Sequence, residues 1–488
     1  MRVDELLRGL GFDCPAGLAA TKVTGLAYDS RKVVPGDLFV AIAGFKSDGS
    51  RFTHDALAKG AVGVVDDKPG PAEGERIACP NARRALALLA DRYYGHPSGR
   101  MKLVGVTGTN GKTTTTYLIR SILQAAGEKT GVIGTIRYLI GERAFAAPNT
   151  TPESLDLQKL LAEMVGEAVT TAVMEVSSHA LALDRVAGCE FKVGVFTNLT
   201  QDHLDFHPTM EDYLQTKLRL FEMLTEKDVA VVNADDPASG RMLAAARKAR
   251  AITYGLSSEA RIRAKAVTLA QRGTRFVITW EDGQVPVNLK LPGKHNVYNA
   301  LAAFSAGLAL GLRNGTMTSG LEAVEGVSGR FELVAAGQPF AVIVDYAHTP
   351  DALERLLLAV REITRGKILC VFGCGGDRDR KKRPLMGDLS TRLADHTIIT
   401  SDNPRTEAPE AIVREIETGV MPGSSYEIIM DRRDAIRKGV ASAGEGDAVV
   451  IAGKGHEDYQ ILGGQRIHFD DREEAAEALA LRRRDADH

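Results

Sequence analysis

The chain has 488 residues, which corresponds to about three domains at roughly 150 residues each. Its 61 Lys and Arg residues nearly balance 63 Asp and Glu residues, and the formal charge of -2 excludes a global basic surface for nucleic acid. Hydrophobic residues make up 44% and charged residues 25%, so a packed protein is expected and disorder is excluded as its main state. No stretch reaches the ~18 apolar residues of a membrane span, and the N-terminal segment does not have the pattern of a signal peptide.

The five cysteines do not form the pattern of a disulfide framework, because they are odd in number and scattered. Only Cys370 and Cys374 are close in sequence, and no second pair completes a zinc site, so core packing is the simpler interpretation. We therefore expect a cytoplasmic protein that binds neither nucleic acid nor membrane and acts as a monomer.

The first part of the chain predicts a small α/β domain. Short apolar strands are expected at 37–44 and 61–67, and the apolar spacing of residues 81–95 predicts a helix. Gly95, His96 and Pro97 end that helix, so the first domain is expected at residues 1–98.

A second domain is expected at residues 99–330, built on buried parallel strands. Near-continuous apolar runs occur at 102–106, 170–178, 192–199 and 228–236. The pattern then changes to alternation at 275–280 and 285–291, and the Asp282-Gly283 pair between these runs predicts a hairpin. A helix is predicted at 296–312.

A third domain is expected at residues 331–488. Its strands are predicted at 340–346, 367–373, 396–400 and 448–453, each followed by a helical stretch. The fold class is therefore α/β: a central parallel-sheet ATPase domain with a phosphate-binding loop (P-loop), flanked by a small N-terminal α/β domain and a Rossmann-like C-terminal domain.

The phosphate loop is the most specific local pattern. In VGVTGTNGKTTTTYLI, a strand, a Gly-rich turn and a helix start follow one another, an order in which backbone N–H groups converge on phosphate oxygens. Lys112 is expected to reach the outer phosphates of a nucleotide, and Thr113 to bind Mg²⁺. The common form would have glycine at Val106; here the glycines are Gly105, Gly108 and Gly111.

Candidate metal ligands follow two of the predicted strands. Glu175 and His203 come at or just after strand ends, the edge at which ligands bind in open parallel sheets. A carboxylate there can hold Mg²⁺ beside the phosphate loop. Lys217 lies within a helical pattern, and the pattern alone predicts a surface lysine.

The motifs TGTNGKTT, EVSSH, NLTQDHLDFH, YLQTKLRLF, HNVYNALAA, GRFE and DYAHTPD occur in this order between residues 107 and 351. Together they resemble the Mur ligases, which build the peptide stem of bacterial cell-wall precursors. The resemblance covers nearly the whole chain. It implies a cytoplasmic ATP- and Mg²⁺-dependent ligase of peptidoglycan synthesis, with roles in cell shape and division.

The resemblance implies a nucleotide site and a metal site. The residues it assigns to ATP are Gly108, Thr109, Asn110, Gly111, Lys112, Thr113, Thr114, Asn299, Arg330 and Asp345. It implies that Lys217 is carbamylated, and that the resulting anion binds Mg²⁺ together with Thr113, Glu175 and His203. Lys112, His203, Lys217 and Arg330 are the residues implied in catalysis.

The resemblance also assigns two substrate sites. For a UDP-linked substrate, it indicates Tyr28, Ser30, Phe45, Lys46, Ser47, Asn149, Thr150, Thr151, Ser177 and Arg185. At Leu183, relatives often carry Gln, so the substrate contact of that Gln is not assigned to this chain. For the incoming amino acid, the set Arg383, Asp402, Asn403, Pro404, Arg405, Gly453 and Glu457 resembles that of members that add meso-diaminopimelate. An arginine fork suits its extra carboxylate, and Glu457 can accept from its ammonium.

The implied reaction activates a carboxylate as an acyl phosphate before an amine attacks it. Two Mg²⁺ ions and closure of the third domain on the second are expected to support this step. Three alternatives remain at this point: a lysine-adding Mur ligase, a folylpolyglutamate synthetase, and a nucleotide-gated binding protein without ligase activity.

Overall fold

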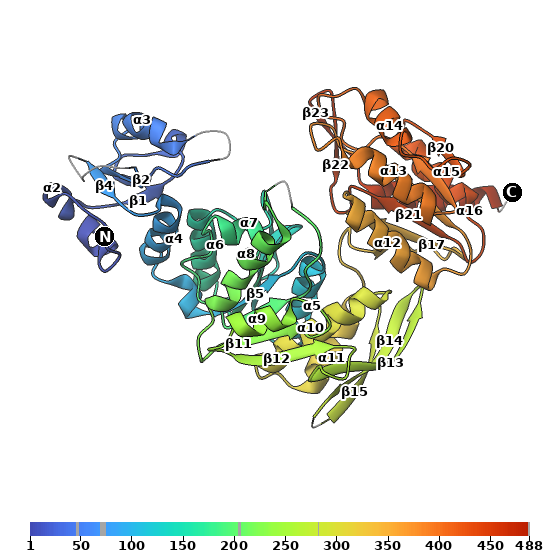
Figure 1. The fold of residues 1–488 in the computed structure, drawn as a ribbon, viewed down its shortest axis with the longest axis horizontal. Helices are drawn as coiled ribbons and strands as arrows, with labels where there is room; N and C mark the ends of the chain where they lie inside the picture. Colours follow the sequence, from blue (N-terminus) through green and yellow to red (C-terminus); the bar gives the residue numbers. More distant parts are fainter. Residues whose placement is uncertain (45–47, 69–74, 204–205, 282, 487–488) are drawn as a thin grey trace. The chain divides into compact units, whose positions relative to one another are not determined.

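The computed structural model describes residues 1–44, 48–68, 75–203, 206–281 and 283–486. The described chain divides into two compact units. The first comprises Met1–Tyr254 with Ala302–Met317, and the second Gly255–Leu301 with Thr318–His488. Both units are α/β folds with parallel sheets (Figure 1). The domain boundaries at residues 98 and 330 remain a prediction.

The first unit begins with a four-stranded parallel sheet in the order β1-β2-β3-β4. Its strands are β1 (Gly25–Ala27), β2 (Asp37–Val40), β3 (Gly63–Asp66) and β4 (Arg76–Ala78). Its helices are α1 (Val3–Leu7), α2 (Ala16–Ala19), α3 (Thr53–Ala58) and α4 (Ala82–Tyr93), with short 3₁₀ turns at Ser30–Lys32, Gly49–Phe52 and Pro97–Arg100.

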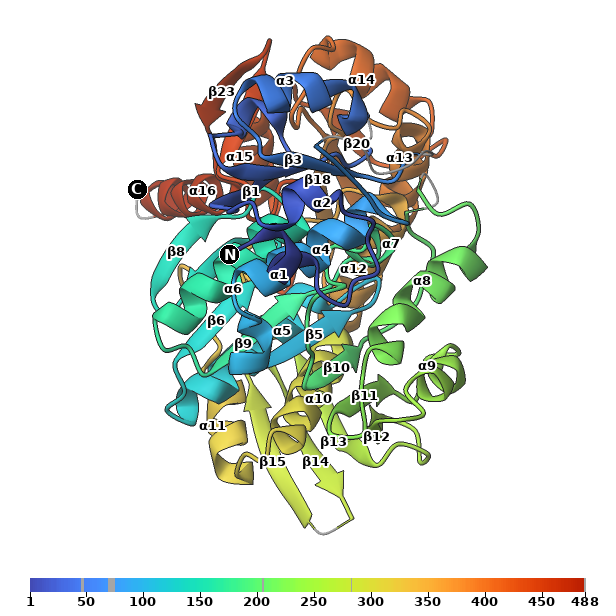
Figure 2. The same cartoon turned by 90° about the vertical axis from the view of Figure 1, so that its left-hand side faces the viewer.

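Successive residues of β2 point to opposite faces of this sheet, and helices cover both faces. Leu38 and Val40 pack in the core with α1 and α4, whereas Phe39 packs with Ala56 of α3. Figure 2 shows α3 on one side of the sheet and α1 and α4 on the other. Burial on both faces explains why the last three residues of β2, Leu38, Phe39 and Val40, are all apolar.

The central sheet of the first unit has the order β12-β11-β10-β5-β9-β6-β7-β8. The strands are β5 (Lys102–Thr107), β6 (Thr130–Ile133), β7 (Arg137–Ile140), β8 (Arg143–Ala146), β9 (Thr171–Glu175), β10 (Val193–Phe196), β11 (Val229–Asn233) and β12 (Arg250–Gly255). The six strands from β12 to β6 are parallel, and β7 and β8 are antiparallel.

The helices associated with the central sheet contribute part of its apolar core. They are α5 (Lys112–Ala125), α6 (Ser154–Gly166), α7 (Ser178–Ala182), α8 (Met210–Glu222), α9 (Ser239–Ala245), α10 (Lys294–Ala309) and α11 (Asn314–Ala323). The division between the two units falls inside α10 and again inside α11. Helix α5 packs on β5, β6 and β9, whereas apolar residues of α6 and α8 share a core with Leu103, Met174 and Val232.

The second unit contains an antiparallel meander and a six-stranded sheet. The meander consists of β13 (Ile262–Ala270), β14 (Gly273–Trp280) and β15 (Gly283–Leu289). The sheet has the order β16-β17-β21-β18-β19-β20, formed by β16 (Glu332–Leu333), β17 (Ala341–Asp345), β18 (Ile368–Phe372), β19 (His396–Ile399), β20 (Tyr426–Ile428) and β21 (Ala448–Ala452). All pairs except β16–β17 are parallel. A separate hairpin joins β22 (Tyr459–Leu462) and β23 (Gln465–His468).

Five helices cover the six-stranded sheet. They are α12 (Pro350–Ile363), α13 (Lys382–Leu393), α14 (Pro409–Glu417), α15 (Arg432–Ser442) and α16 (Asp471–Ala486). Apolar residues of α12, α13 and α14 share one core, and those of α15 and α16 share another. Cys370 and Cys374 are buried as free thiols, as the core-packing interpretation expects. None of the described helices combines the length and apolar character that crossing a bilayer requires.

The predicted strands and helices agree with this fold, and β14 and β15 pair antiparallel as the predicted hairpin requires. Asp282 of the predicted turn lies outside the described residues. Two hairpins were not predicted, β7–β8 and β22–β23. Strand β8 is exposed along its length, and so is β23. Neither carries the buried alternation that identifies a strand from sequence.

Gly373 directly follows β18, at a position where a side chain has no room. A Cβ atom there would overlap the carbonyl oxygen of Thr400 and lie 3.1 Å from the amide nitrogen of Asp402. We expect Gly373→Ala to lower the free energy of unfolding by about 1–3 kcal/mol, the usual cost of overpacking. Urea denaturation measures this change. Gly326→Ala is the control, because its nearest atom would lie 3.9 Å away; equal effects of the two variants would contradict the explanation.

Candidate active site

The phosphate loop leaves β5, whose neighbours in the sheet are β9 and β10. The register places Val106 beside Glu175 on one side and beside Val195 on the other. Gly108 and Gly111 have φ values of 150° and 83°, conformations that side chains rarely adopt. Helix α5 begins at Lys112. The strand, turn and helix thus have the geometry that the sequence predicts, with the first amides of α5 at the loop.

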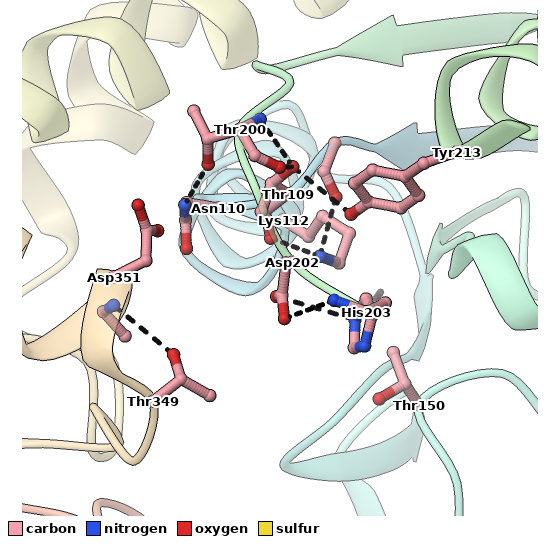
Figure 3. A network of polar contacts seen from close by, with 12 residues as sticks. Thr109, Asn110, Lys112, Thr150, Thr200, Asp202, His203, Tyr213, Thr349 and Asp351 are labelled. Carbon is pink, nitrogen blue, oxygen red and sulfur yellow. Dashed lines mark hydrogen bonds and ion pairs between the residues drawn. The ribbon is translucent and has the colours of Figure 1, made fainter. Parts of the chain in front are cut away.

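Residues 197–200, which follow β10, hold the phosphate loop in place (Figure 3). The amide of Thr109 donates to the carbonyl oxygen of Asn198 at 2.8 Å, and the amide of Asn110 to its side-chain oxygen at 3.0 Å. The amide of Thr200 donates to Oγ1 of Thr109 at 3.0 Å. These contacts fix the loop before any ligand binds, which reduces the entropic cost of binding.

Two lysines meet at the carbonyl oxygen of Gly108. Nζ of Lys112 lies 2.8 Å from it, and Nζ of Lys217 lies 3.0 Å from it. Lys217 is fully buried on α8, and its Nζ also lies 4.3 Å from the centre of the Tyr213 ring. Burial, and then the charge of Lys112, lower the pKa of Lys217 well below its usual value. The pattern-based expectation of a surface lysine is therefore wrong, because the helix turns Lys217 toward the loop.

Glu175 is a buried carboxylate at the end of β9. Its side chain accepts from Oγ1 of Thr113 at 3.0 Å, and from the amide and Oγ1 of Thr135 at 2.8 and 3.1 Å. All of these donors are neutral. A buried anion surrounded by neutral donors favours a cation, and the Thr113 hydroxyl and the carboxylate supply the oxygen ligands that Mg²⁺ prefers. No group of three or more His, Cys, Asp or Glu residues that could hold a metal ion occurs in the described ranges.

His203 follows β10 in a left-handed conformation, with φ of 54°. Its Nε2 lies 3.6 Å from the carboxylate of Asp202, and its ring contacts His179 at 5.0 Å between centres. Burial lowers the pKa of His203 to about 4, so its ring is neutral near pH 7. A neutral imidazole can bind a metal ion. Figure 3 shows Asp202 and His203 close to Lys112.

The predicted substrate residues after β8 and β9 form one connected group. Oγ1 of Thr151 donates to the carbonyl oxygen of Glu175 at 2.7 Å and accepts from the amide of Ser177 at 3.1 Å. Arg185 donates to the carbonyl oxygen of Thr151 at 3.0 Å. Oγ1 of Thr150 lies 3.1 Å from Oγ1 of Thr135, which itself bonds Glu175. Glu175 and the predicted substrate residues therefore share one hydrogen-bond network.

A cavity of about 260 Å³ adjoins these residues, between the N-terminal sheet and the central sheet of the first unit. Tyr28 and Asn149 line it, and the Tyr28 hydroxyl donates to Asp156 at 2.6 Å. Ser30 begins a short 3₁₀ turn after β1. The predicted residues Phe45, Lys46 and Ser47 lie outside the described residues.

Glu153 connects the same region to the N-terminal sheet. Its Oε2 lies 2.9 Å from Nη1 of Arg83 and 3.4 Å from Nε of Arg185. Arg83 also donates to the carbonyl oxygen of Ala43. An arginine of the first domain and a predicted substrate arginine thus share one carboxylate, which sequence reasoning did not identify.

The second unit carries the other residues predicted to bind the nucleotide. The guanidinium of Arg330 lies 5.0 Å from the centre of the Tyr346 ring. Asp345 accepts from the amides of Phe331 and Ala347 at 2.7 and 2.8 Å, and burial raises its pKa. Asn299, on α10, donates to Asn296 at 3.0 Å and is buried.

Asn403 and Glu457 join the two loops predicted to bind the amino acid. Nδ2 of Asn403 donates to Glu457 at 2.9 Å, and Oδ1 of Asn403 accepts from the amide of Ile461 at the same distance. Lys454, whose side chain is fully buried, lies 3.7 Å from Glu457 and also donates to the carbonyl oxygen of Tyr459. Burial raises the pKa of Glu457. A Cβ atom on Gly453 would lie 2.6 Å from Oδ2 of Asp402, which explains the glycine there.

Arg405 follows Pro404 in a left-handed conformation, with φ of 54°. Its Nη1 donates to the carbonyl oxygen of Gly376 at 2.6 Å, and its amide to that of Ile461 at 3.1 Å. A non-glycine residue in this conformation costs about 1–3 kcal/mol and persists only where its surroundings impose it. The loop thus directs the half-buried guanidinium toward residues 375–376.

Arg383 is more enclosed than Arg405, with no exposed side-chain surface. It donates to Glu407 at 2.8 and 2.9 Å and to Glu415 at 2.7 Å. Its Nε is buried without a hydrogen-bond partner in the described structure. Although Arg383 lies in a basic run of the sequence, it is therefore not a solvent-exposed member of that run. Direct contact of Arg383 with the amino acid remains a prediction, because most of its donors already bind carboxylates.

Four further residues of these sites were not singled out from the sequence: Thr135, Tyr213, Glu153 and Lys454. Thr135 and Lys454 each follow the end of a strand, β6 and β21, so both carried a positional signal. Tyr213 begins the quoted YLQTKLRLF motif, four residues before Lys217, so it also carried a local signal. Glu153 acts through contacts with residues distant in sequence, which no local pattern reveals.

Family profiles match almost the whole described architecture. The Mur ligase middle domain matches residues 106–307, the Mur ligase glutamate ligase domain residues 329–455, and the Mur ligase family catalytic domain residues 22–94. A relative from Syntrophomonas wolfei, named UDP-N-acetylmuramoyl-L-alanyl-D-glutamate--2,6-diaminopimelate ligase, is 48% identical over 485 residues, which is 98% of this chain and 99% of the relative. The chain belongs to the Mur ligase family.

Two further comparisons support the assignment. A Bacillus velezensis protein of the same name is 47% identical over 463 residues, covering 94% of each chain. A solved structure of a ligase with that name superposes with a TM-score of 0.72 at 34% identity, covering 96% of this chain and 97% of the other. The three-domain α/β fold class is thereby confirmed, as is the enzyme class, an ATP-dependent amide-bond-forming ligase of peptidoglycan synthesis.

Gly108 provides a direct test of the phosphate loop. A Cβ atom there would overlap Oγ1 of Thr197 and lie 3.1 Å from the amide nitrogen of Asn198. Since backbone strain of this kind costs about 1–3 kcal/mol, we expect Gly108→Ala to weaken ATP binding by about tenfold or more. Isothermal titration calorimetry measures the dissociation constant. Gly166→Ala, at an open position of the first unit, is the control, and unchanged affinity in Gly108→Ala would refute the assignment of this loop.

Proposed function

We propose that this Mur ligase adds meso-diaminopimelate to the D-Glu of UDP-N-acetylmuramoyl-L-alanyl-D-glutamate. The observation that carries the proposal is the loop pair of the second unit, where Asp402, Asn403 and Arg405 lie against Gly453 and Glu457. The names of the relatives, which are 44–48% identical, indicate the same substrate.

The charges of this loop pair suit the far end of diaminopimelate. That end carries both a carboxylate and an ammonium, whereas lysine carries only the ammonium. Arg405 offers a planar guanidinium for the carboxylate, and Glu457 offers an acceptor for the ammonium. Asn403 holds Glu457 at 2.9 Å, so the two recognition groups are oriented before the ligand binds.

The UDP-linked substrate is proposed to bind in the first unit. Tyr28, Asn149 and Thr151 lie at or beside the 260 Å³ cavity, and Arg185 binds the Thr151 carbonyl oxygen. Arg185 and Arg83 together offer positive charge near Glu153, which suits an anionic ligand. The predicted contacts of Ser30, Ser177 and residues 45–47 belong to the same proposal.

The proposed reaction first joins a carboxylate to phosphate. An oxygen of the D-Glu side-chain carboxylate attacks the γ-phosphorus of ATP, the bond to the β,γ-bridging oxygen breaks, and ADP leaves. The amine of diaminopimelate then attacks the acyl carbon, loses a proton to solvent, and expels phosphate that carries one former carboxylate oxygen. Lys112 and the N-terminus of α5 hold the nucleotide phosphates, and Arg330 is proposed to oppose their charge.

Mg²⁺ fits the residues present. Thr113 and Glu175 would hold one ion, and His203 and carbamylated Lys217 a second. When bound, Mg²⁺ neutralises phosphate charge and reduces its repulsion of the substrate carboxylate. The buried position of Lys217 supports the carbamate: a lowered pKa leaves the amine uncharged, so it can attack CO₂ and release a proton. The product is an oxygen-bearing anion, whereas an ammonium could not bind a cation.

Two rival ligases are less well supported. A lysine-adding ligase does not require Arg405, whose strained loop directs a guanidinium toward residues 375–376. A folylpolyglutamate synthetase gives no reason for the N-terminal sheet with its Tyr28–Asp156 contact. We further propose that the enzyme acts as a monomer in the cytoplasm, because a single chain carries all three sets of predicted site residues.

An amino acid panel tests the proposed function. With ATP and the UDP-linked dipeptide, we expect ADP release with meso-diaminopimelate and little with lysine, alanine or glutamate, and none without the dipeptide. With ¹⁸O in the D-Glu carboxylate, label should appear in the released phosphate. Preference for lysine would overturn the substrate assignment, and label confined to the peptide would overturn the acyl phosphate. ATP hydrolysis without ligation would favour a nucleotide-gated binding protein.

Arg405→Lys tests recognition of the far carboxylate. Lysine keeps the positive charge but loses the two-pronged geometry, and a hydrogen bond to a charged group is worth about 1.5–3 kcal/mol. We expect KM for diaminopimelate to rise roughly 10- to 100-fold, with KM for ATP little changed. Steady-state kinetics measure both values. Arg378→Lys, an exposed residue of the neighbouring loop, is the matched control; an unchanged KM in Arg405→Lys would contradict the proposed contact.

A further inference from the structure

The two loops proposed to bind diaminopimelate leave the sheet from strands that are not neighbours. Residues 400–405 follow β19, residues 453–457 follow β21, and β18 pairs with both strands and lies between them. Phe372, at the end of β18, is aligned with Ile399 on one side and with Ala452 on the other. The hydrogen bonds of the sheet therefore do not set the separation of the two loops directly.

Arg432 connects the starts of both loops. This first residue of α15 donates through Nη2 to the carbonyl oxygen of Ala452 at 3.0 Å and through Nη1 to that of Ser401 at 3.4 Å. Ala452 immediately precedes Gly453, and Ser401 immediately precedes Asp402. One guanidinium thus links the backbone atoms from which both loops depart.

Asp471, at the start of α16, holds this guanidinium in place. Its two carboxylate oxygens accept from Nε and Nη2 of Arg432, each at 2.7 Å, and neither side chain has exposed surface. Burial alone would lower the pKa of Arg432, but the carboxylates of Asp471, Asp402 and Glu457 raise it above its usual value. The guanidinium is therefore always charged, and its planar fork fixes the positions of all its acceptors.

Stability alone is a weak explanation for this arrangement. Removing two charges from water costs free energy that their attraction often only balances, and apolar replacements of a buried ion pair are often neutral or stabilising. What an apolar pair could not supply is the two directed hydrogen bonds to Ser401 and Ala452. Those bonds hold in place the backbone atoms at which the loops 402–405 and 453–457 begin.

We infer that Arg432, held by Asp471, is a positioning residue that sets the separation of residues 402–405 from residues 453–457 and so the fit of diaminopimelate. The inference rests on the proposed function and deepens it. Binding groups must be held within a fraction of an ångström by their supporting contacts, and a displacement of about 1 Å can cost about 100-fold in rate.

A second ion pair on the same two helices provides a matched control. Arg433 of α15 donates to Glu474 of α16 at 2.7 Å through two bonds, and no hydrogen bond joins this arginine to either loop in the described part of the chain. Both pairs join an arginine of α15 to a carboxylate of α16. The second pair has no link to the strand ends, and its arginine side chain is 49% exposed.

The decisive variants are Arg432→Met/Asp471→Leu, which removes the buried charges without leaving one unpaired, and Arg433→Met/Glu474→Leu. We expect the first to raise KM for diaminopimelate by about tenfold or more, with KM for ATP and for the UDP-linked dipeptide within about twofold and the thermal midpoint close to wild type. The second should leave all three KM values unchanged. Arg432→Lys retains the charge but only part of the hydrogen bonding, so it should give an intermediate KM for diaminopimelate. If the double variant folds poorly, this single variant tests the inference instead.

Three results would overturn the inference: a folded Arg432 variant with wild-type KM for diaminopimelate, an equal rise in all three KM values, or the same change in the Arg433 and Glu474 control. Failure of the proposed function is distinguishable from these. If the wild-type enzyme prefers another amino acid, the substrate assignment fails, and the KM for that amino acid then tests the positioning role of Arg432.

Discussion

Charged side chains buried at the carboxyl ends of parallel strands are the constraint on which both sites depend. An ion removed from water must find compensating partners, so each buried charge dictates the positions of several neighbours. In the first unit, Glu175 gathers the hydroxyls of Thr113 and Thr135, and Lys217 faces the carbonyl oxygen of Gly108. In the second unit, Arg432 forms an ion pair with Asp471 and also donates to the carbonyl oxygens of Ser401 and Ala452.

The two units compensate their buried charges in different ways. In the first unit, the buried carboxylate of Glu175 has only neutral donors, so a cation would complete its surroundings. The lowered pKa of Lys217 makes its amine reactive. The second unit pairs each of these buried arginines with carboxylates, Arg383 with Glu407 and Glu415 and Arg432 with Asp471. This difference supports the proposal that the first unit binds Mg²⁺ and that the second unit holds a small zwitterion rigidly.

Much of this architecture was predictable from sequence because it is local. Buried parallel strands are continuously apolar, and residues that end them, such as Glu175, fall at the sheet edge where ligands bind. Lys217 shows the limit of local reasoning: its helical pattern predicted a surface residue, and only resemblance to a family assigned it a function. Arg432 shows the limit of resemblance, because its role depends on carbonyl oxygens 20 and 31 residues away. The exposed strands β8 and β23 carried no pattern to detect.

The loop after β18 meets the Asp402–Arg405 loop through backbone atoms. At Gly373 and Gly376, any side chain would collide with the carbonyl oxygens of Thr400 and Pro404. The backbone of the Asp402–Arg405 loop therefore packs directly against the loop after β18, and an insertion or deletion would disrupt this contact. A Mur ligase of this construction can change its amino acid preference by exchanging side chains on a fixed path more readily than by reshaping the path. Engineering of new specificity should accordingly begin with the side chains at positions 403, 405 and 457.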